Sequence, residues 1–533
     1  MTTPTGIDRD APVIARHEID INAPPETVWR LQTDVNNWPA WQTDITAARL
    51  DGPFEPGNSF TWTSYGFTAT SAIYAVADRA RTLWRGANRG ITGTHEWVFR
   101  RLSRFWIGCA TGMTVLAVTI VASGAVTASA ATNQSRGRGM HWVASWGASP
   151  SPATPAGLVP GDMSAAGFSN QTVRDIVFTS VGGSAARVTI SNSFGAAPLR
   201  VGQVDVAVAG PGATLVPGTT HVLTFGGRRG VTIRPCAQAR SDPALMAVPR
   251  LTNLAISIYL PTATGPATYH QDAQQTNYVS TAGNFAGEQD GSAFTTTASS
   301  WFFADALDVA GAAGAPRVHG TVVAFGDSIT NGHQSTQNAN ARWPNDLARR
   351  LLSGPPGQAL GVIDEGISGN RLLHDSPCFG ASALARLHRD ALTQAGAKDV
   401  ILLEGINDIG FSNVPNFGCA VPNTAVSAAQ IIGAYLQIIH RAHAAGLKIF
   451  GGTLTPFKGS FYWSPAAEAK RETVNHWIQT SGAFDGVIDF AAAVASPSDP
   501  LVMNPAFDSG DHLHPDDAGY QAMANAVDLA KLR

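Results

Sequence analysis

The sequence has few charged side chains and no large excess of either sign. Asp, Glu, Lys and Arg make up 14% of its 533 residues, and the formal net charge is −3, whereas soluble domains usually contain about 25% charged residues. A chain without a basic excess has no electrostatic field for nucleic acid, so we exclude that class of partner. Its four cysteines are too few for a scaffold held together by disulfides.

Groups of metal-binding side chains are also scarce. His440 and His443 lie on an expected helix, at a spacing that could bind a metal, but no cluster of carboxylates or cysteines accompanies them. We therefore expect these two histidines to lie on the surface. The sequence gives no reason to expect a metal or any other cofactor.

The chain is long and rich in small and turn-forming residues. Its length exceeds one ordinary domain, so two or three domains are expected. Gly and Pro are plentiful, at 54 and 32 residues, which is typical of exported proteins with many strands and loops. We expect an N-terminal segment over residues 1–99, an apolar segment over 100–130, a linker with a β-rich domain over 131–316, and an α/β domain over 317–533.

The most informative stretch is Gly326-Asp327-Ser328-Ile329-Thr330, which follows an apolar run over residues 321–325. The run predicts a buried strand. A serine on a tight turn at the carboxyl end of such a strand can hold its hydroxyl clear of the sheet as a nucleophile. Gly, Asp and Ser are also ordinary turn residues, so Ser328 taken alone could be a helix N-cap.

Three later polar segments accompany this serine. They are Gly366-Ile367-Ser368-Gly369-Asn370, Gly405-Ile406-Asn407-Asp408 and Asp511-His512-Leu513-His514-Pro515. The first two follow apolar runs, and the carboxyl ends of parallel strands meet at one edge of a sheet. In this order the four segments resemble the four blocks of the SGNH hydrolases, the GDSL lipase/esterase family, over roughly residues 318–533.

The resemblance implies a role for each matching residue. Ser328 would attack an ester carbonyl, His514 would take and return the proton, and Asp511 would orient the imidazole. The backbone N–H groups of Ser328 and Gly369 and the side-chain amide of Asn407 would hold the oxyanion.

Each of these roles has an alternative. Asn407 could be a satisfied buried amide, and His512 could replace His514 as the base. With a histidine base, kcat/KM should fall in acid, and a nearby Asp511 should move the midpoint above the usual pKa of about 6.5.

The rest of the C-terminal domain alternates strands with helices. Helices are expected over 343–352, 381–395, 426–445, 465–480 and 515–532. Strands over 448–455 and 487–490 complete a parallel sheet of about five strands. This pattern predicts a doubly wound α/β fold.

The region from residue 171 to about residue 309 consists of short apolar strands separated by Gly, Pro and Asn turns. That spacing predicts a β-sandwich or jelly roll. The pattern Gly-Phe-Ser-Asn-Gln-Thr-Val-Arg over 167–174 is similar to the N-terminal β-region of several secreted SGNH esterases. This domain could bind carbohydrate through exposed aromatic residues or support the catalytic domain, and we favour support.

Residues 13–98 combine a strand, an Ala-Pro-x-Glu-x-Val-Trp helix opening, an Asn-x-x-x-Trp-Pro-x-Trp pattern and meander strands. They are similar to the SRPBCC or START-like (polyketide cyclase/dehydrase) family, an α+β fold around an apolar pocket. That family closes its pocket with an amphipathic C-terminal helix, whereas this chain continues into an apolar segment. We therefore expect a truncated domain and assign no catalytic residues to it.

The apolar segment has the features of an export signal. Arg100, Arg101 and Arg104 precede a run over 105–133 without a charged side chain, and Ala128-Ser129-Ala130 offers a small-residue cleavage pattern. These features predict a secretory signal cleaved after Ala130, although about 20 apolar residues could also span a bilayer.

Two explanations fit a signal in mid-chain. In one, the hydrolase lies outside the cell and is anchored in the membrane. In the other, which we favour, Met1 is a misassigned start and the natural protein begins near Val98. Both place the hydrolase outside the cytoplasm.

Two cysteines lie in loops expected at the active-site edge. Cys378 follows the second block and Cys419 the third, so a disulfide between them is plausible in an exported protein. Cys236 would then be left over in the β-rich domain.

The sequence as a whole predicts a secreted serine esterase. We expect short-chain acyl or acetyl esters as substrates, on small-molecule, lipid or polysaccharide alcohols, because no separate apolar lid is visible. The aromatic loop over 457–463 could line the substrate groove or pack on the scaffold. The alternative function is a noncatalytic lipid- or glycan-binding protein.

Overall fold

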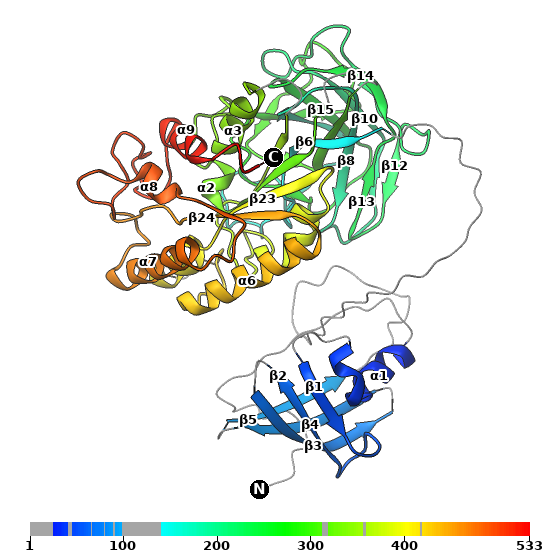
Figure 1. Cartoon of the computed structure of the whole chain (residues 1–533). Helices are drawn as coiled ribbons and strands as arrows, with labels where there is room; N and C mark the ends of the chain where they lie inside the picture. Colours follow the sequence, from blue (N-terminus) through cyan, green and yellow to red (C-terminus); the bar gives the residue numbers. More distant parts are fainter. Residues whose placement is uncertain are drawn as a thin grey trace. The chain divides into compact units, whose positions relative to one another are not determined.

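The computed structural model describes residues 25–40, 45–64, 67–78, 80–88, 91–98, 140–311, 318–354, 359–415 and 418–532 (Figure 1). The chain divides into two compact units, Met1–Arg136 and Gly137–Arg533. The strand expected over 13–21 and the apolar segment over 100–130 lie outside the described residues. Within the ranges given above, no helix has the length and apolar character needed to cross a membrane.

The N-terminal unit is an α+β fold. Its helix α1 (Pro25–Thr33) begins in the predicted Pro24-Pro25-Glu26 opening and is followed by the 3₁₀ helix η1 (Val35–Ala40). Five antiparallel strands pair in sequence order: β1 (Ile45–Leu50), β2 (Ser59–Ser64), β3 (Phe67–Ala77), β4 (Arg81–Asn88) and β5 (Ile91–Val98). Trp38, Phe60 and Trp84 meet in the core, with ring centroids 5.2–6.2 Å apart.

Residues 140–311 form a sandwich-like part with two antiparallel sheets. One sheet has the order β11-β10-β15-β7-β17-β18, and the other has the order β13-β8-β20-β6 with β14 beside β8. Side chains from both sheets, such as Val173, Ile256 and Leu307, share one core. Two short pairs, β9 with β12 and β16 with β19, complete this part.

The bounds of these strands are β6 (Trp142–Gly147), β7 (Gln171–Phe178), β8 (Gly183–Asn192), β9 (Leu199–Val201), β10 (Gln203–Val208), β11 (His221–Val222), β12 (Val231–Ile233), β13 (Ala237–Arg240), β14 (Ala244–Val248), β15 (Asn253–Leu260), β16 (Tyr269–His270), β17 (Asn277–Ala282), β18 (Thr296–Ala298), β19 (Trp301–Phe302) and β20 (Ala304–Ala310).

The C-terminal part is built on a parallel sheet of five strands in the order β22-β21-β23-β24-β25. Strand β21 is fully buried between its two neighbours: Val323 pairs with Ile363 of β22 on one side and with Val400 of β23 on the other, which explains the unbroken apolar run. The strands are β21 (Thr321–Gly326), β22 (Gly361–Gly366), β23 (Ala397–Leu403), β24 (Lys448–Gly452) and β25 (Gly486–Ile488).

Helices cover both faces of this sheet. α3 (Trp343–Leu352) contacts α9 (Asp517–Ala526) on one side, and α6 (Ala428–Ala444) contacts α7 (Pro465–Thr480) on the other (Figure 1). The predicted doubly wound α/β class is confirmed. Shorter helices follow the strand ends: α2 (Ser328–Asn331), α5 (Ile406–Gly410), η3 (Phe411–Asn413) and α8 (Phe490–Val494).

Two helices differ from the prediction. The stretch over 381–395 contains a short α-helix, α4 (Ala383–Leu387), that continues as one turn of π-helix, η2 (His388–Leu392). The last helix begins at Asp517 and not at Pro515. The reason is local: the Asp516 side chain accepts the N–H of Gly519 at 2.9 Å and caps the helix there.

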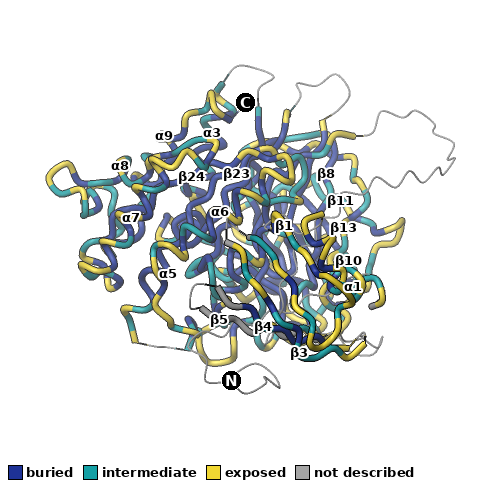
Figure 2. The backbone as a smooth tube through the Cα atoms, turned by 60° about the horizontal axis from the view of Figure 1, so that its bottom comes forward, coloured by how far each residue is buried: buried dark blue, intermediate teal, exposed yellow. Residues whose placement is uncertain are grey.

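The sandwich-like and α/β parts are joined by polar contacts between residues that follow β6 and β7 and the edge strand β22 of the parallel sheet. Val362 N–H donates to Ser180 Oγ at 3.0 Å, and Ser149 Oγ donates to Glu365 Oε2 at 2.7 Å. Figure 2 shows buried backbone along β23 and β24 and exposed residues gathered in outer turns and loops. The two parts belong to one compact unit, Gly137–Arg533.

Cys378 and Cys419 form a disulfide, which confirms the predicted pairing. Cys236 is disulfide-bonded as well, so the expectation that it would be left over is wrong.

Candidate active site

Ser328 lies on a turn between β21 and α2. Asp327 caps the helix, because its Oδ1 accepts the N–H of Ile329 at 3.0 Å. A Cβ on Gly326 would lie 2.1 Å from the carbonyl oxygen of Leu403, closer than packed atoms can approach. The turn therefore needs glycine at the strand end, and it leaves Ser328 at the carboxyl edge of the sheet.

A series of hydrogen bonds ends at Ser328. Its Oγ is 2.8 Å from His514 Nε2, and His514 Nδ1 is 2.6 Å from Asp511 Oδ2. The structure thus brings together the residues predicted as nucleophile, base and orienting carboxylate. His512, the alternative base, pairs instead with Asp508 at 2.6 Å.

The surroundings of this series favour an ionised Asp511 beside a neutral His514. Burial by itself would raise the pKa of Asp511, but the hydrogen bond with His514 and the backbone N–H groups of His514 and Leu513 lower that pKa below its ordinary value. Burial lowers the pKa of His514 and outweighs the opposing effect of Asp511. His514 is therefore in the form that a general base needs at neutral pH.

The predicted oxyanion donors line the same cavity as Ser328. Gly369 has a φ of 76°, and a Cβ there would lie 2.5 Å from the ring of Phe379. The Asn407 amide is 2% exposed: its Nδ2 donates to Asn370 O at 2.8 Å, and its Oδ1 accepts the Tyr462 hydroxyl at 2.9 Å. These bonds fix the amide and leave one of its N–H groups unused.

A cavity of about 600 Å³ opens beside Ser328. Four aromatic residues of the α/β part line it: Phe379, Phe411, Phe461 and Tyr462. Phe379 stacks on Phe411 at 5.5 Å, and Phe411 meets Tyr462 edge to face at 5.3 Å. The loop predicted over 457–463 thus contributes two rings to the cavity, and we call these four residues the aromatic wall.

The sandwich-like part also lines the cavity. Its contribution includes hydroxyl and amide side chains, which we call the polar wall: Gln271, Thr276, Thr297, Ser299 and Ser300. The sequence did not predict this. A region expected to act as a support supplies part of the cavity surface.

The disulfide links the two loops that carry the predicted oxyanion donors. Cys378 lies nine residues after Gly369 and Cys419 twelve residues after Asn407, and the N–H of Cys378 donates to the carbonyl of Cys419 at 3.4 Å. The disulfide therefore restrains the loops of both predicted oxyanion donors together.

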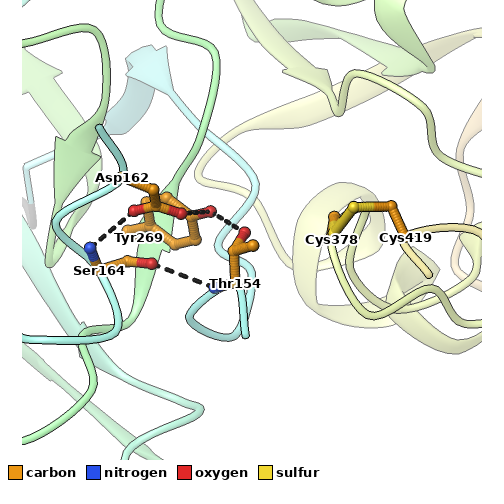
Figure 3. Close-up of a disulfide and its surroundings, with 6 residues drawn as sticks. All are labelled: Thr154, Asp162, Ser164, Tyr269, Cys378 and Cys419. Carbon is orange, nitrogen blue, oxygen red and sulfur yellow. Dashed lines mark hydrogen bonds between the residues drawn. A yellow bond between two sulfur atoms is a disulfide. The ribbon is translucent and has the colours of Figure 1, made fainter. Parts of the chain in front are cut away.

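A loop of the sandwich-like part lies beside this disulfide (Figure 3). Asp162 accepts the Tyr269 hydroxyl at 2.9 Å and the N–H of Ser164 at 2.6 Å, while Thr154 N–H donates to Ser164 Oγ at 3.1 Å. These bonds hold the segment 159–163, which lines the cavity.

Arg386 is fully buried beneath the strand ends. Its guanidinium donates to the carbonyls of Gly326 and Glu365, both at 2.7 Å, and to Asn370 Oδ1 at 2.9 Å. It also lies 4.1 Å over the ring of Phe325. One side chain thus joins β21, β22 and the loop that carries Gly369.

A second His–Asp pair lies at the site and was not predicted. His333 Nδ1 is 2.7 Å from Asp272 Oδ2, and the His333 ring centroid is 4.7 Å from that of His514. Asp272 lies in the sandwich-like part, and His333 belongs to none of the four blocks. No spacing or periodicity in the sequence joins the two.

In the part of the chain that the structure describes, no group of three or more His, Cys, Asp and Glu residues could hold a metal ion. His443 pairs with Asp485 at 2.8 Å.

The fold and the geometry are those that serine hydrolases use. Residues 324–522 match the sequence model of the GDSL-like Lipase/Acylhydrolase family, and residues 12–131 match that of Polyketide cyclase / dehydrase and lipid transport. The part of the chain that carries the site therefore matches the GDSL-like family model, and the predicted resemblance of both parts is confirmed. The second match continues through the apolar segment to residue 131.

The search of curated proteins finds no match. Solved structures with similarity include a GDSL-like lipase from Bacteroides thetaiotaomicron, with 20% identity over 41% of this chain and 91% of that one and a TM-score of 0.30. Another is an acetylxylan esterase from Geobacillus stearothermophilus, with 18% identity over 40% of this chain and 93% of that one and a TM-score of 0.31.

Proposed function

We propose that this protein is a serine carboxylic-ester hydrolase that acts through an acyl-enzyme intermediate. The observation that carries the proposal is the series Ser328–His514–Asp511, with heavy-atom distances of 2.8 and 2.6 Å, at the wall of a cavity. A hydroxyl held by an oriented neutral imidazole is an activated nucleophile.

In the first half of the reaction, Ser328 Oγ attacks the ester carbonyl carbon while His514 Nε2 takes the hydroxyl proton. The carbonyl oxygen becomes an oxyanion, which the N–H groups of Ser328 and Gly369 and the Asn407 amide stabilise. As the first residue of α2, Ser328 has an N–H with no carbonyl one turn earlier in its helix. The C–O bond then breaks, and His514 gives its proton to the departing alkoxide.

In the second half, water replaces the alcohol. His514 takes a proton from the water as it attacks the acyl carbon, and the same donors hold the new oxyanion. The bond to Ser328 Oγ breaks, and the proton returns from His514 to that oxygen. Asp511 remains ionised and stabilises the imidazolium in both halves.

For the substrate, we propose short acyl or acetyl esters of small-molecule, lipid or polysaccharide alcohols. The aromatic wall supports an apolar acyl group, because Phe379 lies against Gly369 and Tyr462 bonds to Asn407, so the rings accompany the proposed oxyanion donors. The polar wall supports an alcohol with hydrogen-bonding groups.

Turnover of p-nitrophenyl acetate by the wild type and Ser328→Ala tests the reaction. We expect the variant to lose at least about 10³-fold in kcat, while the control Ser353→Ala, at an exposed helix end, keeps wild-type turnover. A fluorophosphonate should label Ser328 in the wild type only. Equal turnover by wild type and Ser328→Ala would favour the noncatalytic alternative.

We further propose that the hydrolase acts outside the cytoplasm. The basic flank at Arg100–Arg104, the uncharged run over 105–133 and Ala128-Ser129-Ala130 support export, as does the Cys378–Cys419 disulfide. Mass spectrometry of protein from the culture medium should find a new N-terminus after Ala130. Retention of the protein in the membrane fraction would favour the anchored form instead.

A further inference from the structure

The cavity contains a hydrogen-bonded His–Asp pair that the reaction above does not use. Asp272 receives hydrogen bonds from His333 Nδ1 and Ser368 Oγ, both at 2.7 Å, and from Asn331 Nδ2 at 3.4 Å. Although burial opposes it, these donors lower the pKa of Asp272 to about 2, and the carboxylate raises the pKa of His333 in turn. Asp272 is thus an anion, and its charge favours protonation of His333.

The support behind this pair is rigid. Asn331 also donates to the Asp272 carbonyl at 2.7 Å, and its Oδ1 is 2.8 Å from His270 Nε2. His270 Nδ1 is in turn 3.0 Å from Ser149 O. A network that runs from the sandwich-like part to α2 therefore fixes the position of the Asp272 carboxylate.

Only one polar atom of His333 remains for another partner. Its Nδ1 faces Asp272, so Nε2–H is the remaining donor on the ring. The side chain is 37% exposed and lines the cavity. Because Nδ1 is bound to the carboxylate, Nε2 is the ring nitrogen that is left to bind a substrate.

The position of His333 also identifies the half of the ester that it would contact. Its ring lies 4.7 Å from that of His514, the group that protonates the leaving alcohol. The aromatic wall lies beside the proposed oxyanion donors Gly369 and Asn407, whereas Asp272 belongs to the sandwich-like part, which carries the polar wall. His333 would therefore contact the alcohol half of the ester.

We propose that His333, positioned by Asp272, donates a hydrogen bond from Nε2 to an oxygen of the alcohol half of the ester, and so selects esters of polyhydroxy alcohols over esters of simple alkyl alcohols. This inference rests on the proposed esterase function. It assigns the sandwich-like part a share in substrate selection through Asp272.

Two acetates with the same acyl group and the same number of carbons in the alcohol test it: glycerol monoacetate and propyl acetate, followed by acid release in a pH-stat. The wild type should have the higher kcat/KM for the glycerol ester. His333→Phe keeps a ring against His514 but removes the donor, and should reduce kcat/KM for the glycerol ester roughly 10- to 100-fold, as for a hydrogen bond to a charged group. Its kcat/KM for propyl acetate should change less than about threefold.

Two further variants separate selection from folding. His333→Gln keeps a donor and should retain part of the preference for the glycerol ester. Asp272→Asn weakens the hydrogen bond that positions His333, so its preference should lie between those of His333→Gln and His333→Phe. The ratio of the two kcat/KM values is independent of the fraction of folded enzyme. If His333→Phe does not fold, the ratio of the two kcat/KM values for Asp272→Asn tests the inference instead.

The inference is overturned if His333→Phe reduces both activities by the same factor, since His333 would then act only through His514. It is also overturned if the wild type prefers propyl acetate. Hydrolysis of neither ester by the wild type would instead overturn the proposed function itself.

Discussion

Asn407→Ala is the most direct test of the proposed oxyanion site. The amide is held on two sides, by Asn370 O at 2.8 Å and by the Tyr462 hydroxyl at 2.9 Å, so its remaining N–H has a fixed direction. Truncation removes that donor and leaves Ser328, His514 and Asp511 in place. We therefore expect a loss in kcat with little change in KM.

The size of the loss follows from the geometry. Removal of one preorganised oxyanion donor costs about 10²- to 10³-fold in kcat, or about 2.7–4 kcal/mol. The Tyr462 hydroxyl would also lose its acceptor at a residue only 3% exposed, and an unpaired buried hydroxyl costs about 1–3 kcal/mol of unfolding free energy. Activity and stability should therefore both fall.

Tyr462→Phe is the matched control, because it breaks the same hydrogen bond from the other side and keeps the amide. We expect only about a 2- to 10-fold loss in kcat, because one ordinary hydrogen bond contributes about 0.5–1.5 kcal/mol. The assay is initial-rate hydrolysis of p-nitrophenyl acetate, with urea unfolding of both variants. If Asn407→Ala loses no more activity than Tyr462→Phe, Asn407 is a structural amide and not an oxyanion donor.

Three further predictions concern the base, the disulfide and the second oxyanion loop. Because the base must be neutral and burial lowers the pKa of His514, kcat/KM should fall only as the pH drops below about 6.5; a midpoint above that value would contradict the structure. Replacement of Cys378 and Cys419 by serine should lower the unfolding free energy by about 4 kcal/mol, for a loop of 41 residues; urea unfolding measures this, and a change below about 1 kcal/mol would refute it. Gly369→Ala should reduce kcat for p-nitrophenyl acetate more than about 10-fold, because its φ of 76° costs about 1–2 kcal/mol for alanine and the new methyl meets Phe379; wild-type kcat would show that this N–H is not used.

The sequence predicted the α/β part well because its local signals and its packing agree. The run over 321–325 is apolar since β21 is buried on both faces, and Ser427 with Gln430 forms a capping box at the start of α6. Where a single side chain decides the boundary, prediction was weaker. Proline is favoured in the first turn of a helix, yet the last helix is capped by Asp516 and begins at Asp517, two residues after Pro515.

The residues proposed as nucleophile, base and orienting carboxylate could be selected from the sequence because each lies in an ordered local motif. The pair of Asp272 and His333 could not be found in this way, because 60 residues separate the two and the contact depends on how the sandwich-like part packs on α2. The same holds for Arg386, whose acceptors include two backbone carbonyls; any sequence can supply those. The direction of the His514 pKa shift was also wrong in the sequence-based expectation, because Asp511 was visible in the sequence and burial was not.

Arg386 has a consequence for how the site responds to heat or mutation. Its guanidinium reaches Gly326 O, Glu365 O and Asn370 Oδ1, and lies 3.6 Å from Glu404 Oε2 at the end of β23. The nucleophile and the oxyanion loop therefore share one planar anchor, and a displacement of either is transmitted to the other. Lysine would supply a single point of attachment in place of this fork. With lysine at this position, the nucleophile and the oxyanion loop would therefore lose their fixed positions together instead of one after the other.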